Sequence, residues 1–391
     1  MKYIKILGII TFFIFLIYFM KITYTRPSLS SIANKVIKKC SLAEIKNVCY
    51  ETEIPKLMKF ISMEDAFSVT QIVQDQDSSF PYCHVLGHKL ASIETAKNPE
   101  NWKSVVARCP YGTCSNGCVH GAFQEKYRGD VLTGQTFNEA KKEFENICES
   151  SPTYNLTGLA QGSCYHALGH LLMYITGANI NKSVATCDEL GKKKDGRDFS
   201  GLCYDGAFMQ IFQPLDTDDK SLIKNIVPEK ENVYSFCSHF TGEKKNSCWT
   251  ESWPMFLDTL KTGQGLLSFC SKLNSRGKTE CISDLLYIMP IQFRFNYESI
   301  HKYCLTFTQP FQSQCFAMTA SRILEIDSRN VKKTIDYCGT LDDENRKACF
   351  DKIVTDSSFD FDIKSPEFKE LCSSLPMPWS GQCIQNDNAK K

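Results

Sequence analysis

Apolar residues recur at helical spacing in short segments that polar turns separate. Phe316, Ala320 and Ile323, for example, fall on one face of a predicted helix. Three polar residues occupy positions that are typical of helix N-caps: Asn296, Ser328 and Ser365. The pattern predicts an all-α protein built from helical hairpins.

The first segment has a different pattern, because residues 6–20 are almost entirely apolar and Lys5 and Lys21 flank them. Such a run predicts a signal anchor over 1–24 that stays on the protein and holds it to a membrane. The alternative is a cleaved signal peptide, for which Ser28-Leu-Ser30 is the nearest substitute for a cleavage site. The residues after the anchor are expected to face the periplasm, a lumen or the cell exterior.

The chain has twenty cysteines, and those in its C-terminal half repeat at a regular interval. Five pairs there have ten residues between their members: Cys237 and Cys248, Cys270 and Cys281, Cys304 and Cys315, Cys338 and Cys349, and Cys372 and Cys383. The second cysteines of these pairs are 33 or 34 residues apart. A period of this length is typical of stacked helical hairpins.

The same series extends toward the N-terminus with longer and less regular intervals. Four further pairs are expected there: Cys40 and Cys49, Cys109 and Cys118, Cys148 and Cys164, and Cys187 and Cys203. Cys83 and Cys114 remain and are expected to pair with each other. The alternative joins Cys114 to Cys118 and Cys109 to Cys83. A cytosolic zinc protein would need Cys-x-x-Cys pairs, which the sequence lacks, so the cysteines favour disulfides and an oxidising compartment.

These observations predict about nine units of roughly 34–45 residues, arranged as a solenoid or a curled α/α superhelix. We expect a linker and first helix over 25–48, less regular units with a His-rich site over 49–236, and regular Cys-x10-Cys units over 237–391. The architecture is similar to tetratricopeptide-type solenoids, although their consensus residues are absent. A net charge of +1 without a basic block gives no support for nucleic-acid binding.

Histidines are concentrated at the predicted helix starts of four consecutive units. Their phrases are His84-Val-Leu-Gly-His88, His120-Gly-Ala-Phe-Gln124, His166-Ala-Leu-Gly-His170 and Asp205-Gly-Ala-Phe-Met209. Residues four apart lie on one face of a helix, so each His-x-x-x-His phrase can bind a metal through two nitrogens. The glycines of these phrases are expected to allow close approach of a neighbouring helix.

A third ligand can come from the helix of the next unit. This predicts two metal sites, one of His84, His88 and His120, and one of His166, His170 and Asp205. If the helices curl tightly, the six residues could instead form one dinuclear centre. Zinc and copper are favoured over iron and manganese outside the cytosol. The acidic pair Asp218 and Asp219 is expected in a solvated loop.

The sequence therefore predicts a membrane-anchored, extracytoplasmic metal protein, and a metal-dependent hydrolase or oxidoreductase is the class of enzyme that such a site would support. Two alternatives stay open. In one, the histidines only pack, and a metal-free scaffold binds a peptide, glycan or partner protein on its concave face. In the other, two of the histidines hold non-covalent haem.

Overall fold

The computed structural model describes residues 27–110, 112–127, 131–150, 156–214 and 217–389. These residues form helices and no β-strand beyond two isolated bridges, which confirms the all-α prediction. The predicted anchor over 1–24 lies outside them. Within the described ranges, no helix is both long enough and apolar enough to span a membrane.

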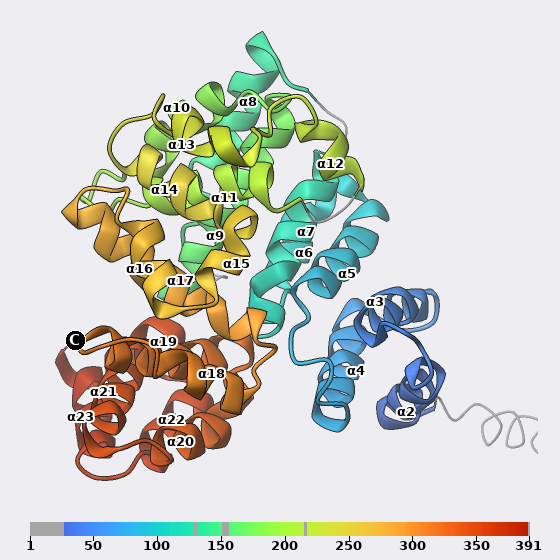
Figure 1. The fold of residues 1–391 in the computed structure, drawn as a ribbon. Coiled ribbons are helices and arrows are strands. Elements are labelled where there is room, and N and C mark those ends of the chain that lie inside the picture. Colours follow the sequence, from blue (N-terminus) through green and yellow to red (C-terminus); the bar gives the residue numbers. More distant parts are fainter. Residues whose placement is uncertain (1–26, 111, 128–130, 151–155, 215–216, 390–391) are drawn as a thin grey trace, which may run out of the picture.

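The helices follow one another with short connections (Figure 1). The first half of the chain contains α2 (Leu29–Cys40), α3 (Lys46–Lys56), α4 (Met63–Gln76), α5 (His84–Ala96), α6 (Trp102–Ala107), α7 (Gly117–Lys126), α8 (Gly134–Phe144), α9 (Gly158–Ile175), α10 (Ile180–Gly191) and α11 (Ser200–Phe212). The second half contains α12 (Thr217–Ile223), α13 (Val233–Cys237), α14 (Glu243–Glu251), α15 (Leu257–Leu260), α16 (Gly263–Cys270), α17 (Ser275–Gln292), α18 (Tyr297–Cys304), α19 (Phe311–Ile326), α20 (Val331–Gly339), α21 (Asp343–Asp360), α22 (Pro366–Ser374) and α23 (Trp379–Ala389). Short 3₁₀ turns lie at η1 (Leu57–Lys59), η2 (Pro99–Asn101), η3 (Cys114–Asn116), η4 (Lys230–Asn232), η5 (Trp253–Phe256) and η6 (Ser328–Asn330).

Polar side chains begin several helices by accepting hydrogen bonds from free backbone amides. Asn296 accepts one from the amide of Ser299 at 2.9 Å, and Ser365 accepts one from the amide of Phe368 at 3.0 Å, as predicted. The prediction for Ser328 is wrong. Its neighbour Asp327 supplies the cap of η6, because its carboxylate can reach the amide two residues later.

One series of helices forms the inside of the structure. In the order α5, α7, α9, α11, α14, α17, α19 and α21, each helix packs against the next. Shorter helices pack on the outside of this series, including α6 on α7, α10 on α11, α16 on α17 and α20 on α21. The face predicted for the segment at Phe316 is confirmed, since Phe316, Ala320 and Ile323 are all buried.

Ten disulfides join neighbouring segments of the chain. Most of them join an outer helix, or the loop after it, to an inner helix, whereas Cys40–Cys49 joins α2 to α3 and Cys372–Cys383 joins α22 to α23. The bonded pairs are Cys40–Cys49, Cys83–Cys114, Cys109–Cys118, Cys148–Cys164, Cys187–Cys203, Cys237–Cys248, Cys270–Cys281, Cys304–Cys315, Cys338–Cys349 and Cys372–Cys383. No cysteine in the described part of the chain is free. This number of disulfides indicates an oxidising environment outside the cytosol.

The chain also returns on itself. Thr113 forms an isolated antiparallel bridge with Asp327, and the amide of Ser328 donates to the carbonyl of Gly112 at 3.1 Å. Helix α21 packs against α9, so the C-terminal third lies next to the N-terminal half (Figure 1). The boundaries proposed at 48/49 and 236/237 stay a prediction.

Candidate metal centre

Glycines bring the histidine-bearing helices into close contact. A Cβ atom on Gly121 of α7 would lie 2.1 Å from the carbonyl oxygen of His88 in α5. A Cβ atom on Gly206 of α11 would lie 1.9 Å from the carbonyl oxygen of His166 in α9. Both distances are far below van der Waals contact, so only glycine permits these two crossings. The close approach expected from the sequence is present at both.

His84, His88 and His120 form a cluster that could hold a metal ion. One ligand nitrogen from each lies within 4.8 Å of the others. The Nε2 atoms of His84 and His88 are 3.1 Å apart, and the ring of His120 is 5.0 Å from each of theirs. His84 and His120 are buried, with 8% and 6% of their surfaces exposed. Helix α5 thus supplies two imidazoles, one turn apart, and α7 supplies the third.

The backbone fixes which nitrogen of His84 is available to a metal. Its Nδ1 lies 3.3 Å from the carbonyl oxygen of Cys114 and 3.2 Å from that of Ser115. A carbonyl can only accept, so Nδ1 carries the proton and Nε2 presents a lone pair. A hydrogen bond from the second ring nitrogen to a carbonyl is the usual orientation of a metal-binding histidine.

His166 and His170 repeat this geometry on α9. Their Nε2 atoms are 3.2 Å apart, and Nδ1 of His170 donates to Oε1 of Gln210 at 2.7 Å. The ring of His120 lies between the two pairs, 5.6 Å from that of His166 and 5.5 Å from that of His170. The structure therefore gathers five histidines in one place.

Asp205 lies in a different surrounding. It lines a cavity of about 500 Å³ with other acidic side chains, including Glu243, Glu280 and Asp284, and no histidine of the described chain lines that cavity. Burial, followed by the nearby charges, raises the pKa of Asp205 to about 6 despite a hydrogen bond from Ser247. Its role as a ligand beside His166 stays a prediction.

All five clustered histidines are neutral at neutral pH. Burial, together with the nearby Arg322 charge, lowers the pKa of His84 to about 4. Burial also holds the pKa values of His88, His120 and His166 well below the ordinary range, and it lowers that of His170. Neutral imidazole is the form that binds metal, so no proton has to leave a charged ring.

In each pair, the distance between the two Nε2 atoms fits two ligands of one metal ion. Metal–nitrogen bonds of about 2.0–2.1 Å at a tetrahedral angle place two nitrogens about 3.3–3.4 Å apart. The observed 3.1 and 3.2 Å are a few tenths shorter. A single N–H···N hydrogen bond within each pair has a similar length, so packing without metal is the competing interpretation.

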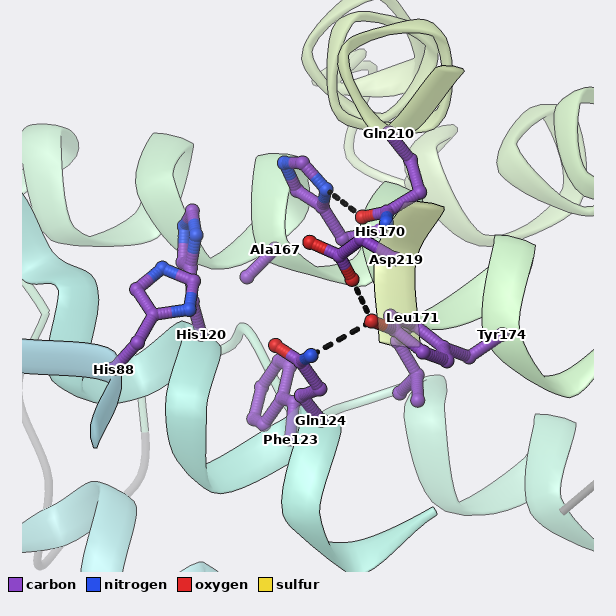
Figure 2. A pocket seen from close by; sticks show the side chains of 10 residues that line it. All are labelled: His88, His120, Phe123, Gln124, Ala167, His170, Leu171, Tyr174, Gln210 and Asp219. Carbon is purple, nitrogen blue, oxygen red and sulfur yellow. Dashed lines mark hydrogen bonds between the residues drawn. The ribbon is translucent and has the colours of Figure 1, made fainter. Parts of the chain in front are cut away.

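A small cavity lies between the two histidine pairs (Figure 2). Its volume of about 10 Å³ matches one water molecule or one ion. It is lined by His88, His120, Phe123, Gln124, Ala167, His170, Leu171, Tyr174, Gln210 and Asp219. Any small molecule that enters it contacts imidazoles from α5, α7 and α9.

Asp219 is a lining residue, and the solvated loop expected for it is wrong. Only 2% of its surface is exposed, because the start of α12 lies against α9 and the hydroxyl of Tyr174 donates to its carboxylate. The side chain of Gln124 donates to the same hydroxyl at 2.7 Å. Figure 2 shows these hydrogen bonds, which join Gln124, Tyr174 and Asp219 in the lining of the same cavity as the histidines.

A buried basic residue approaches the cluster from the far end of the chain. The ring of Tyr82 stacks on that of His84 at 5.9 Å, and the Arg322 guanidinium lies 5.8 Å from Tyr82. Arg322 also donates to the hydroxyl of Tyr287 and pairs with Glu325 at 3.6 Å. Its charge is therefore balanced locally, while it still disfavours a proton on His84.

Three neighbours of the histidines were not singled out from the sequence as functional residues: Gln124, Met209 and Asp219. A signal existed for two of them. Gln124 and Met209 end the phrases that begin at His120 and Asp205, four residues on, where His88 and His170 stand in the other units. Asp219 had no comparable signal.

Comparisons of the chain with protein-family models, with curated proteins and with solved structures found no match. The function of the site is therefore inferred from the arrangement of its own residues.

Proposed function

We propose that this protein is an extracytoplasmic metal-binding protein whose centre is formed by His84, His88 and His120. One observation carries the proposal. The Nε2 atoms of His84 and His88 face each other at 3.1 Å, while backbone carbonyls hold the Nδ1 proton of His84 on the opposite side of the ring. His120 supplies a third nitrogen within 4.8 Å.

Three neutral imidazoles favour zinc or copper among the metals that an exported protein meets. Three protein ligands leave one position for water or another small ligand. The adjacent cavity of about 10 Å³ supports chemistry on a molecule the size of water or dioxygen rather than on a large substrate. A hydrolase or an oxidoreductase is the class of enzyme that such a centre would support.

The surrounding architecture belongs to the same proposal. The inner series of helices and the recurring disulfides support a curled repeat of helical hairpins, and the apolar run over 6–20 supports an N-terminal membrane anchor. In this arrangement the rigid repeat holds the histidines, and the anchor keeps the centre at a membrane surface.

Elemental analysis of the full-length protein, purified without chelators, tests the metal. We expect bound zinc or copper in the wild type and at least one ion fewer in the variant His84→Ala with His88→Ala. The matched control is His239→Ala, because His239 is exposed and away from the cluster. Circular dichroism of all three proteins checks that the helices are retained.

A wild type that purifies without metal and takes up neither zinc nor copper on titration would contradict the proposal. The histidines would then be packing residues of a scaffold. In that case the double variant would lose stability, by about 1–3 kcal/mol for lost buried hydrogen bonds, with no change in metal content.

A further inference from the structure

We infer that His166, His170 and Met209 form a second metal site, which prefers copper(I). This site goes beyond the proposed function, because it uses other residues and a different donor set. It does not require an ion at His84, His88 and His120.

Nε2 of His166 lies close to both of the other donor atoms. Nε2 of His166 lies 3.2 Å from Nε2 of His170 and 3.3 Å from Sδ of Met209. With bonds of about 2.0 Å to nitrogen and about 2.3 Å to sulfur, a tetrahedral ion separates nitrogen and sulfur by about 3.5 Å. Both separations are therefore within a few tenths of an ångström of those in a three-coordinate or four-coordinate site.

The second nitrogen of His170 is already occupied. Its Nδ1 donates to Oε1 of Gln210 at 2.7 Å, which leaves the Nε2 lone pair directed at His166. Burial lowers the pKa values of both histidines, so neither ring needs to lose a proton before it binds.

Helix packing holds the sulfur donor near the nitrogen donors. Met209 and Gln210 lie on α11, and α11 crosses α9 where Gly206 contacts the carbonyl oxygen of His166. Because that crossing leaves no room for a Cβ atom, Met209, which comes three residues later on α11, is kept beside His166. The site is thus built by two helices in direct backbone contact.

The thioether determines the metal. Thioether sulfur is a soft ligand that selects copper(I), whereas imidazole alone also suits zinc and copper(II). The first cluster has the nitrogen of His120 as its third donor, and the second has the sulfur of Met209. We therefore expect the two sites to differ in metal preference although their histidine pairs match.

The equivalent residue in the other unit behaves differently. Gln124 occupies in α7 the position that Met209 occupies in α11, and it donates a hydrogen bond to the hydroxyl of Tyr174. A glutamine there has no soft donor atom, whereas a methionine can supply a sulfur ligand. The two units have thus diverged at the residue that decides the donor set.

Anaerobic titration of the full-length protein with copper(I), supplied as its acetonitrile complex against a chromophoric copper(I) chelator, tests the second site. This reagent requires no thiol, so the disulfides stay intact. We expect Met209→Leu to lower the copper(I) affinity at least tenfold and to leave zinc uptake unchanged. The matched control is Met318→Leu, a partly buried methionine of α19, which should titrate like the wild type.

X-ray absorption of the copper(I)-loaded protein gives an independent readout. The wild type should show a sulfur neighbour at about 2.3 Å, and Met209→Leu should lack it. Titration of His84→Ala with His88→Ala separates the two proposals, because this variant should lose zinc and keep copper(I) bound with its sulfur neighbour. A double variant that binds as much zinc as the wild type would contradict only the proposed function.

Two results would overturn the inference. One is a Met209→Leu variant that binds copper(I) as tightly as the wild type. The other is a copper(I) spectrum that shows nitrogen or oxygen neighbours alone. Either would mean that the contact between His166 and Met209 is packing or a weak N–H···S hydrogen bond.

Discussion

Gly121 of α7 lies directly against the backbone carbonyl of His88 in α5. A Cβ atom on Gly121 would come 2.1 Å from that oxygen, closer than any real side chain approaches a carbonyl. The distance between these helices, and with it the position of His120 relative to His84 and His88, therefore depends on the absence of one methyl group.

Gly121→Ala should separate α5 from α7 and weaken the centre. We expect a loss of about 1–3 kcal/mol in the free energy of unfolding, because the helices must shift to admit the methyl group. Metal affinity at His84, His88 and His120 should fall as well. Chemical denaturation and zinc titration measure the two effects.

The control for this substitution is Gly339→Ala at the end of α20, where an added Cβ atom meets nothing within 4 Å. It should be neutral or slightly stabilising in both measurements. A Gly121→Ala protein that matched this control would show that the close crossing does not hold the histidines in place.

Removal of the Cys83–Cys114 disulfide should affect both stability and metal. The two cysteines are 31 residues apart in sequence, so the chain-entropy model gives a loss of about 4 kcal/mol. Cys83 directly precedes His84, and the carbonyl of Cys114 accepts from its Nδ1. Replacement of both cysteines by alanine should therefore lower metal affinity, measured by competition with a chelator.

The Cys372–Cys383 disulfide provides the comparison, because it lies in the C-terminal helices away from the histidines. Its removal should cost about 3 kcal/mol, as expected for a separation of 11 residues, and should leave metal affinity unchanged. Equal changes in metal affinity for the two double variants would mean that the link at His84 has no special role.

We expect the buried carboxyl group of Asp360 to lower the stability of the protein at alkaline pH. Both of its carboxylate oxygens are buried without a hydrogen-bond partner. Burial, with the charges of Glu325 and Asp356, raises its pKa to about 9. The folded state therefore holds a proton that the unfolded state has released. The contribution of Asp360 to stability is complete below 3.8, the pKa of its carboxyl group in the unfolded state, and is lost as the pH rises toward about 9.

Asp360→Asn should remove this dependence. Between about pH 6 and pH 9, the free energy of unfolding of the wild type should fall relative to the variant, by at most about 1.4 kcal/mol for each pH unit. The clustered histidines, whose pKa values are lowered in the folded state, change the stability of both proteins equally, so their effect cancels in the comparison. Parallel slopes for the two metal-free proteins in denaturation series would refute the assignment.

The spacing of residues that are close in sequence predicted much of the structure, because such spacing determines which side chains share a helix face or a helix end. Cysteines eleven residues apart can be joined across one helix end, and histidines four apart on a helix must share a face. The helical fold, most of the disulfides and the pairing of His84 with His88 follow from such short-range rules, whereas Cys83–Cys114 and the third ligand His120 were predicted from the order of the repeats.

What the sequence did not reveal depends on contacts between distant segments. His120 meets His166 only because α7 crosses α9, and Asp219 is buried only because α12 lies over Tyr174. Arg322 reaches Tyr82 because the chain returns on itself. No periodicity encodes these approaches, and the packing of whole helices determines them.

The bridge between Thr113 and Asp327 also constrains how this chain can evolve. Repeat proteins commonly gain or lose units, because each unit contacts only its neighbours. Here the residues on the two sides of the bridge must meet, so an added or deleted hairpin between them would move Asp327 away from Thr113 and Arg322 away from Tyr82. Duplication in this lineage should therefore be tolerated before residue 82 or after residue 328, and selected against in between.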